Sequence, residues 1–262
     1  MRFGLCTGDL GRIERLDQLG YDYADIGAST LLPFAPESEF APVRERLRSA
    51  PVRAEALGGF LPGNLKVVGP VVDWPRVRDY LEVTLGRAAE VGVEVVNWGS
   101  AESRMVPPGF SYARAFEQLE RFCVLADEIA QRNRQTIVIE AINPRECNIV
   151  YYVRDALHLA QVVNLSRIRV LADYYHMAKQ DEPMEHLLEA GAWLQHAHTS
   201  DDHRRFPSPD GYDQRRFLQY LKRAGYAGRL SFECRAPEDF DGEARRAVEY
   251  VRLLWEALDL RP

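Results

Sequence analysis

Four polar side chains stand at the ends of short apolar runs in the C-terminal half of the chain. They are Glu140, Asp173, His198 and Glu233. A charge at the end of a buried strand is costly unless a partner or a metal ion neutralises it. Carboxylate and imidazole ligands without thiolates suit Mn²⁺, Mg²⁺, Co²⁺ or Fe²⁺. We therefore predict that these four side chains converge on one divalent metal ion.

Two of the predicted ligands, Glu140 and Glu233, also suit proton transfer beside a carbonyl group. A divalent metal that binds the carbonyl oxygen and an adjacent hydroxyl stabilises the enediolate that forms when the neighbouring proton leaves. One glutamate can take that proton as general base, and the other can supply a proton from the opposite face. The outcome is epimerisation at that carbon, isomerisation if the proton goes to the next carbon, or dehydration if a β-hydroxyl leaves. The ligand set alone leaves these three outcomes open.

Eight strand-like apolar runs alternate with eight helical patterns along the chain. The strand candidates are residues 3–6, 21–26, 52–57, 93–98, 136–140, 168–172, 193–198 and 229–232. The helix candidates are residues 12–19, 37–49 (with the regular part starting near Pro42), 74–91, 111–132, 153–163, 183–190, 214–224 and 242–258. Strands separated by helices pair in parallel. Eight such units predict an α/β fold, a (β/α)8 TIM barrel that forms a single domain over residues 1–262.

The predicted barrel brings the polar strand ends together at one rim. Active sites of such barrels lie at the C-terminal ends of the strands, which is where the four predicted ligands stand. A doubly wound open sheet is the alternative, but the segment TGDLGR after the first strand does not match the glycine-rich phosphate turn of that fold. The barrel is therefore the favoured architecture.

The composition argues against several classes of partner. The net charge is −6 and there is no basic block, so we expect no nucleic-acid partner and no membrane partner. The cysteines have no CxxC spacing, as expected of reduced intracellular thiols. The N-terminal segment has no signal-peptide core, and no apolar run approaches the roughly 20 residues that span a bilayer. We expect a soluble, cytoplasmic protein.

The segments IEAINPRECN, LADYYHM, HAHTSDDHRRFP and SFE carry a family resemblance. On these motifs the chain resembles the sugar phosphate isomerase/epimerase family of xylose-isomerase-like TIM barrels, which includes ketose 3-epimerases, hydroxypyruvate isomerases and inosose dehydratases. The resemblance implies an enzyme with one divalent metal ion held by Glu140, Asp173, His198 and Glu233. Mn²⁺ is the first expectation, with Mg²⁺, Co²⁺, Fe²⁺ or Zn²⁺ as alternatives.

The same resemblance implies that Glu146, His176 and Arg204 bind the substrate. The residues themselves leave other interpretations open: a supporting role for His176, and a solvated position in a loop for Arg204 and Glu146. The epimerases carry an arginine directly after the asparagine of the Glu-x-x-Asn motif. Here Pro144 stands at that position and Arg145 follows, which is a departure from the ketose epimerase pattern.

Other residues near the motifs have weaker signals. His196 precedes His198 by two positions, so it faces the same side of the strand about 6 to 7 Å deeper in the barrel and is expected to support the site rather than bind metal. Three aromatic side chains are candidates for an apolar wall around a sugar, with core or loop packing as the alternative. They are Phe60, Trp98 and Tyr175.

The family also resembles DNA-repair endonucleases of the endonuclease IV type, which need a trinuclear zinc site with histidines from early strands. The first histidine of this chain is His158, inside a helical pattern. That absence argues against DNA repair.

We therefore expect a divalent-metal-dependent isomerase or epimerase that acts on a small sugar or keto-sugar through a metal-stabilised enediolate. The alternative is a metal-dependent dehydratase, a lyase, of a cyclic polyol ketone such as an inosose. A barrel that binds a ligand without catalysis is the third hypothesis. The resemblance further implies self-association as a homo-oligomer.

Overall fold

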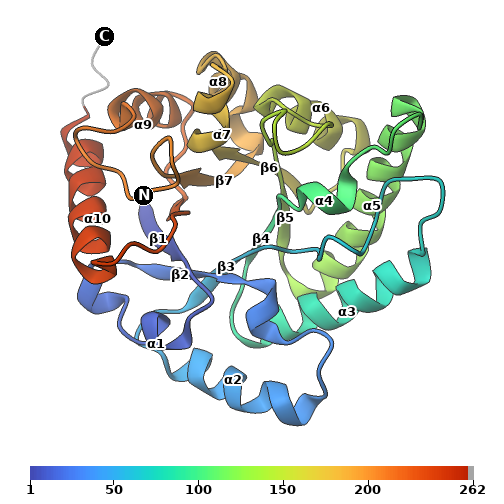
Figure 1. Ribbon diagram of the computed structural model, residues 1–262, viewed down its shortest axis with the longest axis horizontal. Coiled ribbons are helices and arrows are strands. Elements are labelled where there is room, and N and C mark those ends of the chain that lie inside the picture. The colour runs from blue at the N-terminus through green and yellow to red at the C-terminus, as the bar shows by residue number, and fades with distance from the viewer. Residues whose placement is uncertain (259–262) are drawn as a thin grey trace.

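The strands form a closed parallel barrel in the computed structural model, which describes residues 1–258 (Figure 1). Each strand pairs in parallel with the next, and β8 closes on β1. The strands are β1 Arg2–Cys6, β2 Tyr23–Gly27, β3 Ala54–Gly58, β4 Val95–Trp98, β5 Thr136–Glu140, β6 Ile168–Asp173, β7 Leu194–Thr199 and β8 Arg229–Phe232. This confirms the predicted single-domain TIM barrel. The end of the expected 1–262 domain, residues 259–262, lies outside the described residues.

Helices surround the barrel and connect successive strands (Figure 1). They are α1 Leu10–Ile13, η1 Asp17–Leu19, η2 Ala28–Leu31, α2 Glu37–Ser49, α3 Trp74–Glu90, α4 Ala101–Arg104, α5 Tyr112–Asn133, α6 Val153–Val163, α7 Tyr174–Lys179, α8 Glu185–Ala190, η3 Gly191–Trp193, α9 Gln214–Arg223 and α10 Phe240–Ala257. Aspartate or serine side chains cap several N-termini by accepting a backbone N–H, as at Asp73 and Ser111. Within residues 1–258, no helix combines the length and hydropathy needed to cross a bilayer.

Two helix predictions were wrong in detail. The expected helix 12–19 is broken into α1 and η1, and Ile13, Leu16 and Leu19 from this segment are all buried. Helix α2 begins at Glu37 and contains Pro42, rather than becoming regular near it. A proline in a helix lacks one backbone donor, and packing of the buried Phe40 and Leu47 holds the helix despite that loss.

The barrel interior is closed by an apolar plug beneath its C-terminal mouth. The plug consists of Tyr23, Ala56, Val95, Val138 and Leu171, each at most 5% exposed. A separate, larger core fills the space between the strands and the surrounding helices. The plug excludes water from below, so polar groups at the mouth are solvated from one side only.

The plug generates a prediction about Gly4. A Cβ atom at Gly4 would overlap the ring of Tyr23, which is fully buried and whose hydroxyl lies 2.9 Å from Ser231 Oγ. Gly4→Ala should therefore lower the free energy of unfolding by about 1 to 3 kcal/mol, the usual cost of overpacking. Urea denaturation measures this change.

The matched control is Gly86→Ala in α3. No atom lies within 4 Å of a Cβ at this helical position, so the variant should gain about 0.5 to 1 kcal/mol from the helix propensity of alanine. Equal stability of the two variants would contradict a tightly filled barrel interior.

Candidate metal centre

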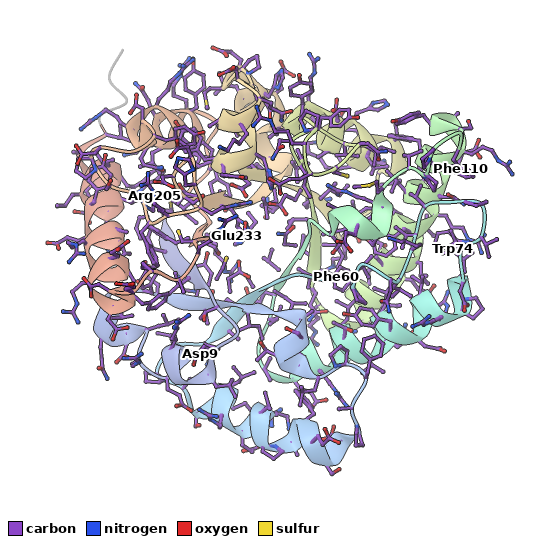
Figure 2. The ribbon with its side chains drawn as sticks, viewed as in Figure 1. Asp9, Phe60, Trp74, Phe110, Arg205 and Glu233 are labelled. Carbon is purple, nitrogen blue, oxygen red and sulfur yellow. The ribbon has the colours of Figure 1, made fainter. Side chains whose placement is uncertain are left out.

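The structure brings the four predicted metal ligands together at the barrel mouth. Ligand atoms of Glu140, Asp173, His198 and Glu233 all lie within 4.8 Å of one another. Glu140 and Asp173 are the last residues of β5 and β6, His198 lies in β7 beside Asp173, and Glu233 follows β8. Figure 2 shows Glu233 near the centre of the ring of helices. Parallel strands end at one rim of the barrel, so side chains far apart in the sequence meet there.

The residues present fit a divalent cation. The side chains of Glu140, Asp173 and His198 are at most 5% exposed, whereas that of Glu233 is 40% exposed. Glu140 Oε1 is buried and has no hydrogen-bond partner among the described residues. Three carboxylates and one imidazole offer oxygen and nitrogen ligands to a hard or borderline metal. A cation at this position would satisfy the orphaned oxygen and offset the carboxylate charges.

The electrostatics of the metal-free site follow from burial and crowding. Burial and then the charge of Glu233 raise the pKa of Glu140 to about 8 from its ordinary value of 4.5. Burial acts on Asp173 in the same direction, but the positive charge of Arg204 and its hydrogen bond outweigh it and lower the pKa of that carboxyl. At neutral pH, therefore, the metal-free site keeps a proton on Glu140 while Asp173 stays ionised.

Arg204 lies against two of the predicted ligands. Its Nη1 atom lies 2.7 Å from Asp173 Oδ2 and 2.8 Å from Glu233 Oε2, and its guanidinium stacks 4.0 Å from the ring centroid of Tyr175. The side chain is only 14% exposed, so Arg204 is not a solvated loop arginine. The adjacent Arg205 turns away to Asp201 and is 63% exposed.

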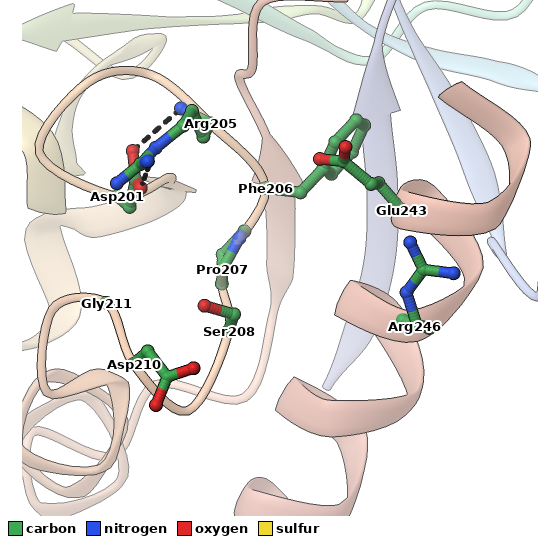
Figure 3. A pocket seen from close by; sticks show the side chains of 9 residues that line it. All are labelled: Asp201, Arg205, Phe206, Pro207, Ser208, Asp210, Gly211, Glu243 and Arg246. Carbon is green, nitrogen blue, oxygen red and sulfur yellow. Dashed lines mark hydrogen bonds and ion pairs between the residues drawn. The ribbon is translucent and has the colours of Figure 1, made fainter. Parts of the chain in front are cut away.

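Figure 3 shows this Arg205–Asp201 pair on the rim of a separate surface hollow. None of the four predicted metal ligands lines that hollow. Arg204 therefore contacts the predicted metal ligands, whereas Arg205 lines the separate hollow.

His176 lies in the short helix α7, which the sequence patterns did not predict. Asn143 Nδ2 lies 2.8 Å from His176 Nδ1, and Arg204 Nη2 lies 3.0 Å from His176 Nε2. Burial lowers the pKa of His176, and Arg204 adds to that effect while Asp173 opposes it. His176 Nε2 is 3.8 Å from both Glu140 Oε1 and Asp173 Oδ2, so the imidazole stands beside the four-residue cluster.

Glu146 lies on the exposed rim of the same site. Its Oε1 atom accepts hydrogen bonds from Asn143 Nδ2 at 3.0 Å and from the Tyr175 hydroxyl at 3.3 Å. The carboxylate is therefore solvated but fixed in place. Through Asn143, the rim is connected to His176.

Two of the three candidate wall residues take the alternative of core packing. Trp98 and Phe60 are fully buried and pack on Phe122, with ring centroids 4.2 and 6.4 Å away. Trp98 is the last residue of β4 and Phe60 lies in the loop after β3, and both side chains belong to the core between the strands and the helices. Tyr175 is the aromatic side chain that contacts the site.

Two residues outside the predicted site hold Glu140 in place. Asn97 Nδ2 donates to Glu140 Oε2 at 2.9 Å, and Arg104 Nη2 donates to the Glu140 carbonyl at 2.6 Å. The signal for Asn97 was an amide in the apolar strand VVNW. Arg104 had no comparable signal, because its burial depends on α4 folding back over Trp98.

A buried aspartate, Asp25, was also missed. Its Oδ2 atom accepts a hydrogen bond from Ser231 Oγ at 2.7 Å and lies 3.2 Å from His196 Nε2 and 3.3 Å from His198 Nε2. His196 thus lies beneath the four-residue cluster and not in it. Burial acts to raise the pKa of Asp25, but its contacts with the two histidines outweigh burial and lower it. The signal was an acid within the strand YADIG.

The chain belongs to the xylose isomerase-like TIM barrel family, whose model matches residues 13–254. An L-ribulose 3-epimerase from Methylomonas sp. (strain DH-1) is 29% identical over 136 residues, which cover 52% of this chain and 47% of that protein. The chain thus spans about half the length of this curated relative.

Two solved structures share the fold. A D-allulose 3-epimerase from Methylomonas sp. in complex with D-allulose has a TM-score of 0.84 and 20% identity, and the match covers 97% of this chain and 96% of that chain. The IOLI protein with a bound zinc atom has a TM-score of 0.75 and 16% identity, and the match covers 100% of both chains.

The raised pKa of Glu140 generates a prediction about the metal-free protein. The folded pKa lies above the unfolded one, so the Glu140 contribution to the free energy of unfolding is complete below about pH 4.5 and is lost as the pH rises through about 8. Glu140→Gln mimics the protonated acid at every pH. In the presence of EDTA, the variant should match wild type near pH 5 and become more stable than wild type near pH 9.

Urea denaturation of both proteins at the two pH values measures the difference. The control is Asp127→Asn, which changes another buried carboxylate. The pH dependence of the stability difference is due to Glu140 only if Asp127→Asn does not show it. A stability difference between Glu140→Gln and wild type that does not vary with pH would contradict the prediction.

Proposed function

We propose that this protein is a divalent-metal-dependent epimerase or isomerase that acts on a small sugar or keto-sugar. The observation that carries the proposal is the convergence of Glu140, Asp173, His198 and Glu233 within 4.8 Å at the barrel mouth. Membership in the family and the epimerases among the relatives support it. The proposed domain covers the whole chain, residues 1–262.

The proposed metal ligands are the four converging residues, and the proposed ion is Mn²⁺. Their oxygen and nitrogen atoms also suit Mg²⁺, Co²⁺, Fe²⁺ and Zn²⁺, and no thiolate belongs to the cluster. When bound, a divalent ion would polarise the substrate carbonyl and so acidify the neighbouring C–H bond. All other steps of the proposed reaction are assigned to side chains of this chain.

Glu140 and Glu233 are the proposed proton-transfer pair. They come from β5 and from the end of β8, with β6 and β7 between them, so they approach the mouth from different sides. A substrate carbon between them would lose a proton to one carboxylate and regain one from the other, which inverts its configuration. Glu233 is partly exposed and Glu140 is buried, so the substrate would meet Glu233 first.

Arg204, His176 and Glu146 are the proposed substrate contacts. The guanidinium of Arg204 is fixed by two carboxylates and by the Tyr175 ring, so its N–H groups are oriented before a substrate arrives. Such donors stabilise negative charge that develops on an enediolate oxygen. His176 and Glu146, connected by Asn143, would bind substrate hydroxyls at the same rim.

We further propose a cytoplasmic location, self-association as a homo-oligomer, and no nucleic-acid or membrane partner. The four cysteines among the described residues are free thiols, which supports a reducing compartment. The net charge of −6 supports the absence of a polyanionic partner.

Incubation of the Mn²⁺-loaded protein with a panel of ketoses in deuterated water tests the proposal. We expect deuterium to enter the carbon next to the carbonyl, with a new epimer or aldose detected by NMR. An unsaturated product with loss of water would instead indicate a dehydratase. No exchange with any ketose, with a metal bound, would contradict the proposed function.

Glu140→Gln and Glu233→Gln should each lower kcat/KM by at least about 100-fold, because general acid–base groups typically contribute 10² to 10⁴ in rate. Steady-state kinetics with the best substrate of the panel measures the loss. Asp127→Asn is the control, since Asp127 is equally buried but pairs with Arg167 N and Gln131, away from the site. Full activity of Glu140→Gln would contradict the proposed role of Glu140 in proton transfer.

A further inference from the structure

Asp25 is a buried carboxylate that the proposed reaction does not use. It lies in β2, is 1% exposed, and stands above the apolar plug. A carboxylate in such a place is strongly destabilising unless several donors satisfy it. The surrounding groups therefore indicate what Asp25 is for.

The groups that face Asp25 form one connected network. The Tyr23 hydroxyl lies 2.9 Å from Ser231 Oγ, which donates to Asp25 Oδ2 at 2.7 Å. His196 Nε2 lies 3.2 Å from the same oxygen. All of these side chains are at most 1% exposed, so the network is a rigid floor beneath the metal centre.

His198 stands between this floor and the predicted metal ligands. Its Nε2 atom is buried, lies 3.3 Å from Asp25 Oδ2 and has no other polar group that it could face among the contacts of the described residues. Its Nδ1 atom hydrogen-bonds with Glu233 Oε2 at 3.3 Å and lies 3.9 Å from Glu140 Oε1. Ionised carboxylates only accept hydrogen bonds, so Nδ1 carries a proton towards Glu233 when no metal is bound. A metal ion at Nδ1 would replace that proton, and the remaining ring proton on Nε2 would face Asp25.

We propose that Asp25 is a positioning residue for metal binding, which fixes the Nε2–H tautomer and the ring orientation of His198. The inference rests on the proposed metal centre and extends it to a residue on the far side of the barrel. A carboxylate behind a ligating imidazole typically changes metal affinity by 10- to 100-fold.

A second cation site is the competing interpretation of the same atoms. Cys6, Asp25 and His198 also offer ligand atoms within 4.8 Å of one another. That site would require both ring nitrogens of His198 to bind metal. Asp25 would have to bind that cation through Oδ1, which is buried and has no hydrogen-bond partner among the described residues, because Oδ2 faces Ser231 and both histidines. The number of ions bound separates the two interpretations.

Titration calorimetry with Mn²⁺ on metal-free protein tests the proposal. Wild type should bind one ion, and Asp25→Asn should bind it about 10 to 100 times more weakly. Asp127→Asn, the matched buried control, should bind as wild type does. Thermal unfolding of the metal-free proteins shows whether each variant is folded.

Nitrogen-15 NMR of the imidazoles in the Zn²⁺-loaded wild type gives a readout that needs no variant. The proposal expects a protonated Nε2 and a metal-shifted Nδ1 for His198. A metal on Nε2 would overturn it even if Asp25→Asn does not fold.

Other outcomes are equally decisive. Unchanged affinity of a folded Asp25→Asn variant would overturn the role of Asp25 alone and leave the metal centre intact. Two bound ions, with a thiolate-to-Co²⁺ absorption band that Cys6→Ser removes, would establish the competing site. Absence of metal binding by wild type would overturn both the inference and the proposed function.

Discussion

Carboxylates crowd the barrel mouth, and their mutual repulsion is the constraint on which the rest of the site depends. Glu140, Asp173 and Glu233 have ligand atoms within 4.8 Å of one another, and burial removes most of the water that would screen them. Positive charge and bound protons offset this repulsion. Arg204 bridges two of the carboxylates, and the third holds a proton when no metal is bound. A divalent ion would replace that proton.

The barrel tolerates the crowded carboxylates because its interior is divided into an apolar layer and a polar layer. The plug around Val138 and Leu171 contributes burial without any charged group, and the Tyr23 hydroxyl at its edge hydrogen-bonds with Ser231. The layer above the plug contains the charges. Asp25, Ser231 and His196 lie at the boundary and contact one another through Asp25 Oδ2, Ser231 Oγ and His196 Nε2. The framework is therefore rigid where orientation matters, and the loops that carry Arg204 and Glu146 lie at the open rim.

The sequence predicted the four converging side chains because each one puts a charge or an imidazole at the end of an apolar strand. The same reasoning could not separate Tyr175, which contacts the site, from Trp98 and Phe60, which pack in the core. It also failed for Arg104, whose burial results from the short helix α4 that no periodicity revealed. The expected helix 12–19 consists of two short pieces, α1 and η1, because the burial of Ile13, Leu16 and Leu19 does not require a continuous helix.

The alternation of apolar runs with helical patterns, and the charges at the strand ends, are properties of the sequence itself. They determined the parallel barrel and the location of the site, because parallel strands must present their C-terminal ends at one rim. Only the tertiary structure decided which groups face each other across the barrel. Asp25 meets His196, 171 residues further along the chain, only because β8 closes on β1. Distance and burial in three dimensions decide where the Arg204 side chain points, whether Glu140 holds a proton and what surrounds His198. No local sequence pattern encodes these properties.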